Sequence, residues 1–169
     1  MRIFLIGFMG VGKTTIGKKV AAALHIPFLD LDSYIAQQNN MSVADIFHHF
    51  GEDYFRMCES KCLQEIISAN ENVLLACGGG TPAYQNNMQL MNENGTTIYM
   101  CAGFDFLMSR IKQSTTIRPM VKKHEEKGSE NGLLKLFEQR KSVYERALRV
   151  VDVEKLPSNE VVERILKIL

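Results

Sequence analysis

The feature that most constrains this chain is a glycine-rich loop at residues 7–15, which reads Gly-Phe-Met-Gly-Val-Gly-Lys-Thr-Thr. Gly7 and Gly12 are separated by four residues, and the second glycine is followed by Lys13 and Thr14. The loop lies between an apolar run at residues 3–6 and a helix-forming run at residues 16–24. A strand, this spacing and a helix, in that order, are typical of a phosphate-binding loop. A glycine-rich turn without a ligand is the alternative, and the flanking strand and helix disfavour it.

Each residue type in the loop has a physical reason to be there. Glycines allow the backbone to turn tightly and to approach phosphate oxygens, so that successive N–H groups and the following helix N-terminus converge on the anion. We expect Lys13 to reach the β- and γ-phosphates of a nucleotide and Thr14 to offer its hydroxyl to Mg²⁺. The predicted nucleotide-binding residues of the loop are Gly10, Val11, Gly12, Lys13, Thr14 and Thr15.

Apolar runs that predict strands alternate with helix-forming segments along the chain. Strands are predicted at residues 2–6, 27–32, 72–77, 97–101 and 150–153, and helices at about 13–25, from 33, and at 42–50, 52–69, 85–93, 104–112, 133–147 and 160–169. This alternation predicts an α/β fold of the P-loop NTPase type, a five-stranded parallel sheet with helices on both faces, in a single domain over residues 1–169. Ligands of such sheets bind beyond the carboxyl ends of the strands, where Gly7, Asp30, Asp32 and Gly78 fall.

A polar and charged segment interrupts this pattern at about residues 113–132. A connection of that length inside a compact domain is usually functional or disordered, and we expect a mobile lid, formed by a long loop or a short helix. Arg118 lies in this segment. Charged runs are most often simply solvated, but an arginine on a lid above a phosphate loop is a common way to neutralise a transferring phosphoryl group.

Two acidic residues follow the second predicted strand. Asp30 and Asp32 are two residues apart, so both side chains can project towards the phosphate loop from one face. A nucleotide-dependent transferase needs one carboxylate near Mg²⁺ and another that orients or deprotonates the acceptor hydroxyl. The alternative is that one of them caps the helix expected from Ser33, a role that suits Asp32 and suits Asp30 poorly.

Two arginines and a glycine triplet are further candidates. Arg56 lies three residues before Glu59 on a predicted helix, and the simplest interpretation is a surface ion pair of little energetic value. Arg140 falls on the apolar stripe of the last long helix, where an unpaired guanidinium would cost several kcal/mol, so either a buried acid or a ligand carboxylate must serve it. Three glycines from Gly78 to Gly80 after a buried strand indicate a close approach to the backbone or an unusual turn.

Composition excludes several classes of protein. Lysine and arginine number 20 against 19 acidic residues, a net charge of +1, which gives no field for broad nucleic-acid binding. The apolar run before the loop is too short for a signal peptide or a membrane span, so we expect a soluble cytosolic protein. The cysteines lack paired C-x-x-C spacing and sit in apolar patterns, which favours buried free thiols over zinc ligands or disulfides. Without an obvious exposed apolar stripe, a monomer is expected.

With these positions assembled, the chain resembles the shikimate kinases over nearly its full length. The segments that carry the resemblance are the loop at residues 7–14, residues 28–32 and 55–59, the glycine triplet, Arg118 with Pro119, and Gln139 and Arg140 followed by Tyr144. Only the phosphate loop is specific by itself. The order and spacing of all the segments together are specific to this family among small phosphate-loop kinases.

The resemblance implies ATP-dependent phosphorylation of the 3-hydroxyl of shikimate, a step towards chorismate and the aromatic amino acids. By this resemblance, helices at about residues 33–62 would bind shikimate, with Phe47 and Phe55 packing around it and Glu59 orienting Arg56. The resemblance also assigns individual roles: Asp32 to the acceptor hydroxyls and as the base, Arg56 and Arg140 to the carboxylate, Gly79 to a backbone contact, Thr14 and Asp30 to Mg²⁺, Lys13 to the phosphates and Arg118 to ATP.

The chain departs from the family pattern at two places. Ala76 replaces a hydroxyl residue near Mg²⁺, and a polar segment from Gln113 to Thr116 replaces a glycine-rich lid tip, which leaves Arg110 as a candidate for the adenine contact. A kinase for gluconate or a nucleoside monophosphate is the nearest alternative. A GTP-dependent switch lacks an Asn-Lys-x-Asp motif here, and a silent binding module would not need the full set of transfer residues.

Overall fold

A computed structural model describes residues 1–113 and 130–169 of the chain. Over these residues the chain forms a five-stranded sheet in the order β2-β3-β1-β4-β5, in which each neighbouring pair is parallel. The strands are β1 (Arg2–Ile6), β2 (Phe28–Asp30), β3 (Val73–Ala76), β4 (Thr96–Cys101) and β5 (Arg149–Asp152). In the centre of the sheet Leu5 is in register with Ala76 of β3 and with Ile98 of β4. The predicted parallel α/β sheet is confirmed.

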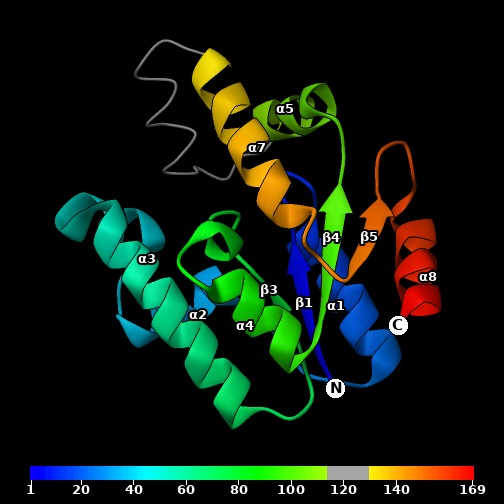
Figure 1. Cartoon of the computed structure of the whole chain (residues 1–169), viewed down its shortest axis with the longest axis horizontal. Helices are drawn as coiled ribbons and strands as arrows, with labels where there is room; N and C mark the ends of the chain where they lie inside the picture. Colours follow the sequence, from blue (N-terminus) through cyan, green and yellow to red (C-terminus); the bar gives the residue numbers. More distant parts are fainter. Residues whose placement is uncertain (114–129) are drawn as a thin grey trace.

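Helices cover both faces of this sheet (Figure 1). On one face α1 (Lys13–Leu24) packs against α8 (Ser158–Ile168), and on the other lie α3 (Val43–Ala69) and α4 (Asn87–Asn94). The central strands are therefore buried on both sides, which explains why β1 and β3 read as continuous apolar runs. The helices α5 (Phe104–Gln113) and α7 (Glu130–Tyr144) lie beyond the carboxyl ends of the strands, and α2 (Leu31–Gln38) and the 3₁₀ helix η1 (Thr81–Ala83) complete the described elements.

The strand order places a crevice next to the phosphate loop. From β1 the chain crosses through α1 to β2 on one side of the sheet centre, whereas from the neighbouring β3 it crosses through α4 to β4 on the opposite side. Connections that leave adjacent strands in opposite directions open a crevice at the carboxyl ends of those strands, the usual ligand site of such sheets.

The start of α2 corrects one prediction. The strand β2 ends at Asp30 and the helix begins at Leu31, two residues before the predicted start at Ser33. The Asp30 carboxylate accepts a hydrogen bond from the backbone N–H of Ser33 at 3.3 Å, so Asp30 is the N-cap and Asp32 lies in the first helical turn. The prediction was wrong because a cap bonds the residue three positions on, and that spacing fits a strand that stops at Asp30.

The long helix α3 begins as the sequence predicts. The Ser42 hydroxyl accepts a hydrogen bond from the backbone N–H of Asp45 at 3.1 Å, as expected of an N-cap. Gly51 has φ 81° and ψ 177°, so the helical backbone is interrupted there, as predicted, and resumes directly afterwards. On the inner face of the second half, Cys62 and Ile66 are buried, and Cys58 is half-buried.

Candidate active site

The phosphate loop leaves β1 in a conformation that requires glycine. Gly7, Gly10 and Gly12 have φ values of 143°, 83° and 100°. A Cβ atom on Gly7 would lie 2.6 Å from the carbonyl oxygen of Met100, so a side chain is excluded there by space as well as by conformation. Gly12 caps α1 without a side-chain hydrogen bond, and the N-terminus of a helix is a suitable site for an anion.

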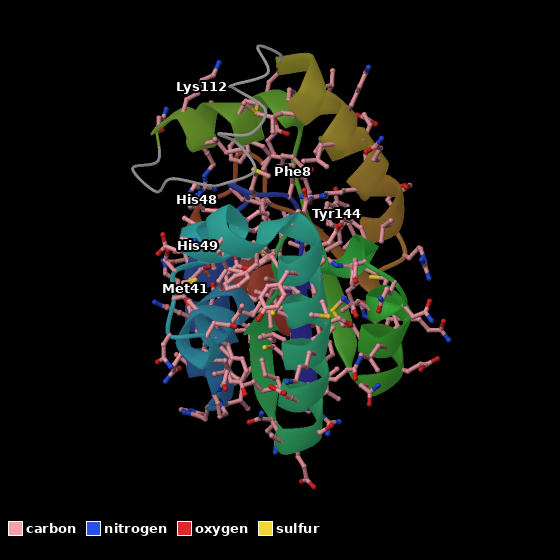
Figure 2. All side chains as sticks on the ribbon, turned by 90° about the vertical axis from the view of Figure 1, so that its left-hand side faces the viewer. Phe8, Met41, His48, His49, Lys112 and Tyr144 are labelled. Carbon is pink, nitrogen blue, oxygen red and sulfur yellow. The ribbon has the colours of Figure 1, made fainter. Side chains whose placement is uncertain are left out.

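An aromatic contact with α7 anchors the phosphate loop. Phe8 is 1% exposed and extends towards the layer formed by α5 and α7 (Figure 2). There its ring packs edge-on against Phe137 of α7, with 5.4 Å between the ring centroids. The loop is therefore fixed both by its own glycines and by the helix that carries Arg140.

A first cavity of about 280 Å³ opens over this loop. Lys13 lines it, and its ammonium donates hydrogen bonds to the carbonyl oxygens of Gly7 at 2.8 Å and Phe8 at 3.1 Å. Arg110, the sequence candidate for the adenine contact, also borders the cavity. Seven residues that the sequence predicts for the nucleotide and metal site line the first cavity: Gly10, Gly12, Lys13, Thr14, Thr15, Asp30 and Asp32. Val11 is 1% exposed, so its side chain belongs to the core and only its backbone can serve a ligand.

Two oxygen donors in this cavity fit a magnesium ion. The Thr14 hydroxyl donates a hydrogen bond to the Asp30 carboxylate at 2.7 Å, so the two groups already converge. Mg²⁺ keeps several of its waters and is usually held by one or two protein oxygens together with substrate phosphates. Within the described residues the structure holds no group of three or more His, Cys, Asp or Glu side chains placed to hold a metal ion. Ala76, also on the cavity wall, adds no side-chain oxygen.

A second cavity of about 90 Å³ lies next to the first. One of its walls is apolar and aromatic, with the rings of Phe47 and Phe55 stacked at 4.6 Å between centroids. Arg56 and Arg140 also line this cavity, and the guanidinium of Arg56 lies over the ring of Phe55, 5.5 Å from its centroid. The two cavities share four lining residues, Met9, Asp32, Gly78 and Gly79. Asp32 therefore borders the space open to a ligand in either cavity.

Arg56 is not the surface residue of the simplest sequence interpretation. It is 8% exposed, and its guanidinium pairs with the fully buried Glu59 and, at 3.3 Å, with Glu52. Burial acts to lower the pKa of Arg56, but the adjacent carboxylates of Glu59 and Glu52 outweigh it and raise the pKa. That interpretation failed because helical spacing places Glu59 beside Arg56 but does not show that α2, η1 and α4 pack around the pair.

Arg140 has a different environment. It is 6% exposed, and among the described residues it forms no ion pair. Burial lowers the pKa of this guanidinium, and the nearby positive charge of Arg56 lowers it further. The sequence left two possible partners for Arg140, a buried acid and a ligand carboxylate. In the described part of the chain no acid forms an ion pair with Arg140. The arrangement favours an anionic ligand in the second cavity.

The glycine triplet allows the charged groups to converge. A Cβ atom on Gly78 would lie 2.5 Å from Oε1 of Glu59 and 3.0 Å from Oδ1 of Asp32. On Gly80 a Cβ would overlap the guanidinium of Arg56. The carbonyl of Gly79 accepts a hydrogen bond from the Tyr144 hydroxyl, which reaches inward from the end of α7 (Figure 2). Close approach of side chains to the backbone, the first of the two predicted reasons for the triplet, therefore applies.

Asp32 lies where both cavities meet. Its side chain opens to the cavities, but the surrounding protein displaces much of its hydration. This desolvation, followed by the negative charges of Glu59 and Asp30, raises the pKa of Asp32 to about 6. Lys13 and Arg56 oppose the shift. A carboxylate with this pKa is suited to proton transfer near neutral pH.

The structure thus brings together nearly all of the predicted site residues. Arg56, Gly79 and Arg140 line the second cavity, and the predicted loop residues other than Val11 surround the first together with Asp30 and Asp32. Arg118 and most of the predicted lid at 113–132 lie outside the described residues. Sequence reasoning missed Met9 and Val43 on the cavity walls. Val43 and Phe47 are four residues apart on one helical face, a signal that could have identified Val43.

Comparisons with known proteins agree on one family. A sequence model of the family described as shikimate kinase matches residues 9–169. A shikimate kinase of Azobacteroides pseudotrichonymphae is 39% identical over 165 residues, covering 98% of this chain and 97% of the relative. The crystal structure of a shikimate kinase from Bacteroides thetaiotaomicron superposes with a TM-score of 0.88 at 32% identity, covering 99% and 97% of the two chains. A shikimate kinase from Acinetobacter baumannii, solved in complex with shikimate, gives a TM-score of 0.84 at 27% identity and covers 99% and 91%.

Proposed function

The chain belongs to the shikimate kinase family, and on that premise we propose how its own residues transfer a phosphoryl group from ATP to shikimate. The reaction gives shikimate 3-phosphate and ADP, a step in aromatic amino acid biosynthesis. One observation carries the assignment of residues: two adjoining cavities share the carboxylate of Asp32, and only the second presents two arginines beside an aromatic wall.

The first cavity takes the phosphates of ATP. The N–H groups in the first turn of α1 bind the phosphate oxygens, and Lys13, which lines the same cavity, supplies the positive charge. Thr14 and Asp30 would hold Mg²⁺, which when bound would neutralise charge on the phosphate oxygens. The adenine lies near Arg110, in a hollow that also includes Gly12 of the loop and Val153 and Leu156 after β5.

The second cavity takes shikimate. Its carboxylate lies between Arg56 and Arg140, since two guanidinium groups suit the planar carboxylate group. The carbon ring packs against Phe47 and Phe55, and the backbone of Gly79 adds a polar contact. Paired arginines disfavour neutral sugars and favour an acidic acceptor, which separates this site from that of a kinase for an uncharged sugar.

With shikimate held in this way, its 3-hydroxyl meets Asp32 at the boundary of the two cavities. Asp32 is ionised at neutral pH because its pKa is about 6, so it accepts the hydroxyl proton as the oxygen bonds to the γ-phosphorus and the bond to ADP breaks. Phosphoryl transfer has a loose transition state, so in-line positioning and charge neutralisation account for most of the acceleration. By the family resemblance, Arg118 contributes positive charge from the lid.

ADP release by the purified protein tests this assignment directly. The protein is given ATP and Mg²⁺ with shikimate, quinate, gluconate or AMP, and turnover is expected on shikimate alone. Asp32→Ala is expected to abolish turnover while the far-UV circular dichroism spectrum stays unchanged. Turnover on gluconate or AMP would contradict the assignment of shikimate as the acceptor. Near-normal turnover by Asp32→Ala would contradict the role of Asp32 as the base. ATP binding without turnover on any acceptor would favour a catalytically silent module.

The remaining properties are part of the same proposal. We expect a single domain that acts as a monomer in the cytoplasm, and light scattering after size-exclusion chromatography would measure the mass of the particle. Neither described part of the chain contains a helix with the length and apolarity needed to cross a membrane.

A further inference from the structure

A buried chain of hydrogen bonds runs from α4 to the guanidinium of Arg56. The Ser60 hydroxyl donates to Oδ1 of Asn87 at 2.8 Å, and Nδ2 of Asn87 donates to the carbonyl oxygen of Thr81 at 3.0 Å. The Thr81 hydroxyl then donates to Oε1 of Glu59 at 2.5 Å, and the other carboxylate oxygen of Glu59 accepts from Arg56. These five side chains come from α3, η1 and α4 and are all buried.

The link between Thr81 and Glu59 is the critical one. Both residues are 0% exposed, so no bulk water can replace the hydroxyl if it is removed. The carboxylate has one partner on each oxygen, Thr81 on one and Arg56 on the other, and the two bonds together fix its orientation. A charged group that loses a buried hydrogen-bond donor is strongly destabilised and moves to find another.

The same chain also ties the glycine turn to the helix that carries Arg56. Thr81 follows the triplet directly, and its backbone N–H donates to the carbonyl oxygen of Gly78 at 3.1 Å. Asn87 adds a second tie, since it joins Thr81 to Ser60, the neighbour of Glu59 on α3. The backbone that would contact shikimate and the arginine that would bind its carboxylate are thereby held in one spatial relation.

We propose that Thr81 and Asn87 are positioning residues for the acceptor. They hold the Glu59 carboxylate, and through it Arg56, in the orientation that receives the carboxylate of shikimate. Neither residue lines either cavity, so their effect passes through Glu59 and Arg56. This inference rests on the proposed role of Arg56 as a ligand of the acceptor.

The test is the steady-state kinetics of Thr81→Val, which keeps the shape of the side chain and removes its hydroxyl. The KM for shikimate is expected to rise about tenfold, the size of one lost hydrogen bond to a charged group, with little change in the KM for ATP. Thr81→Ser is expected to restore the KM. Asn87→Leu is expected to raise the KM for shikimate in the same selective way.

Thr97→Val provides the matched control. Thr97 is also a 0% exposed threonine, and its hydroxyl donates to Asn92 at 2.6 Å and accepts from the N–H of Leu148 at 2.9 Å, away from both cavities. Its loss is expected to lower the unfolding midpoint without changing the KM for shikimate. If Thr97→Val changes that KM as much as Thr81→Val does, a general loss of stability explains both and the inference is wrong.

A double-mutant cycle with Arg56→Ala separates this inference from the proposed function. If Thr81 acts through Arg56, Thr81→Val has no further effect on the KM for shikimate once Arg56 is alanine. Additive effects would overturn the inference. A normal KM for Arg56→Ala alone would instead overturn the proposed acceptor site. A raised KM for Arg56→Ala with an unchanged KM for Thr81→Val would leave that site intact and reject the positioning role.

Discussion

Replacing each acceptor-site arginine by methionine should change the stability of the ligand-free protein in opposite directions. Arg56 has the buried partner Glu59, whereas Arg140, equally buried, has no ion-pair partner among the described residues. Removing Arg56 leaves the charge of Glu59 buried and unpaired. Removing Arg140 takes away a cation whose desolvation lowers its pKa and is only partly offset by Tyr144, Glu59 and Glu52. Both variants should nevertheless bind shikimate poorly.

The magnitudes follow from the burial of the two groups. Breaking a buried ion pair by removing one partner costs about 3–5 kcal/mol, and this loss in unfolding free energy is expected for Arg56→Met. For Arg140→Met we expect an unfolding free energy that is higher by about 1 kcal/mol, since methionine fills the same space without a charge to desolvate. Loss of one charge-assisted contact should weaken shikimate binding by about 2–4 kcal/mol in either variant, or roughly 30- to 800-fold in Kd.

Urea unfolding without ligand and isothermal titration calorimetry with shikimate measure the two quantities on the same samples. The expected signature is weak binding in both variants with unfolding midpoints on opposite sides of the wild-type value. A midpoint for Arg140→Met as low as that of Arg56→Met would refute the reasoning, because it would show that Arg140 has a structural anion. Wild-type affinity for shikimate in Arg140→Met would refute its role in binding.

Three further outcomes are expected. Gly78→Ala should lower the unfolding free energy by about 1–3 kcal/mol, because its Cβ would lie 2.5 Å from Oε1 of Glu59. The unfolding free energy of Gly79→Ala should stay within about 0.5 kcal/mol of the wild-type value, because the nearest atom to its Cβ would be 3.4 Å away. Equal unfolding midpoints of the two variants in urea would contradict this expectation. Because burial raises the pKa of Asp32 to about 6, kcat/KM for shikimate should be constant above pH 7 and should fall as the pH drops through 6. A constant kcat/KM down to pH 5 would exclude Asp32 as the base. Asp30→Asn keeps a side chain that can act as N-cap, so its thermal unfolding midpoint should be nearly unchanged. Its affinity for Mn²⁺ in the presence of ADP, measured by electron paramagnetic resonance, should fall about tenfold. Unchanged Mn²⁺ binding would argue against Asp30 as a metal ligand.

The fold could be predicted from local pattern because its main signals are local. A buried parallel strand is a continuous apolar run, and the phosphate loop is defined by residues that are adjacent in the sequence. The ends of elements were less certain, since they depend on single hydrogen bonds. The start of α2 illustrates this, because either Asp30 or Asp32 could cap a helix and only the end of β2 decides between them.

The site could be predicted in its residue types but not in its contacts. Nothing in helical spacing shows that Arg56 and Glu59 are buried, since their burial comes from elements more than 20 positions away, such as Thr81. The hydrogen bonds of Asn87 were missed for the same reason: its partner Ser60 is 27 residues distant and no motif records the pair. The glycine triplet did signal a close approach, but the approaching groups became visible only in three dimensions.

The adjacency of the two cavities matters for inhibitor chemistry. Met9, Asp32, Gly78 and Gly79 line both spaces, so the two halves of one linked molecule would lie against the same four residues. A compound that links a cyclic acid to a polyphosphate would present its second half at an effective concentration set by its linker, which is in the millimolar range for short flexible links. Such a compound can exceed the affinity of either half by about 10²- to 10⁴-fold. Such a compound would have to bind the two arginines and the phosphate loop at the same time. This requirement would favour the present site over an unrelated nucleotide-binding protein.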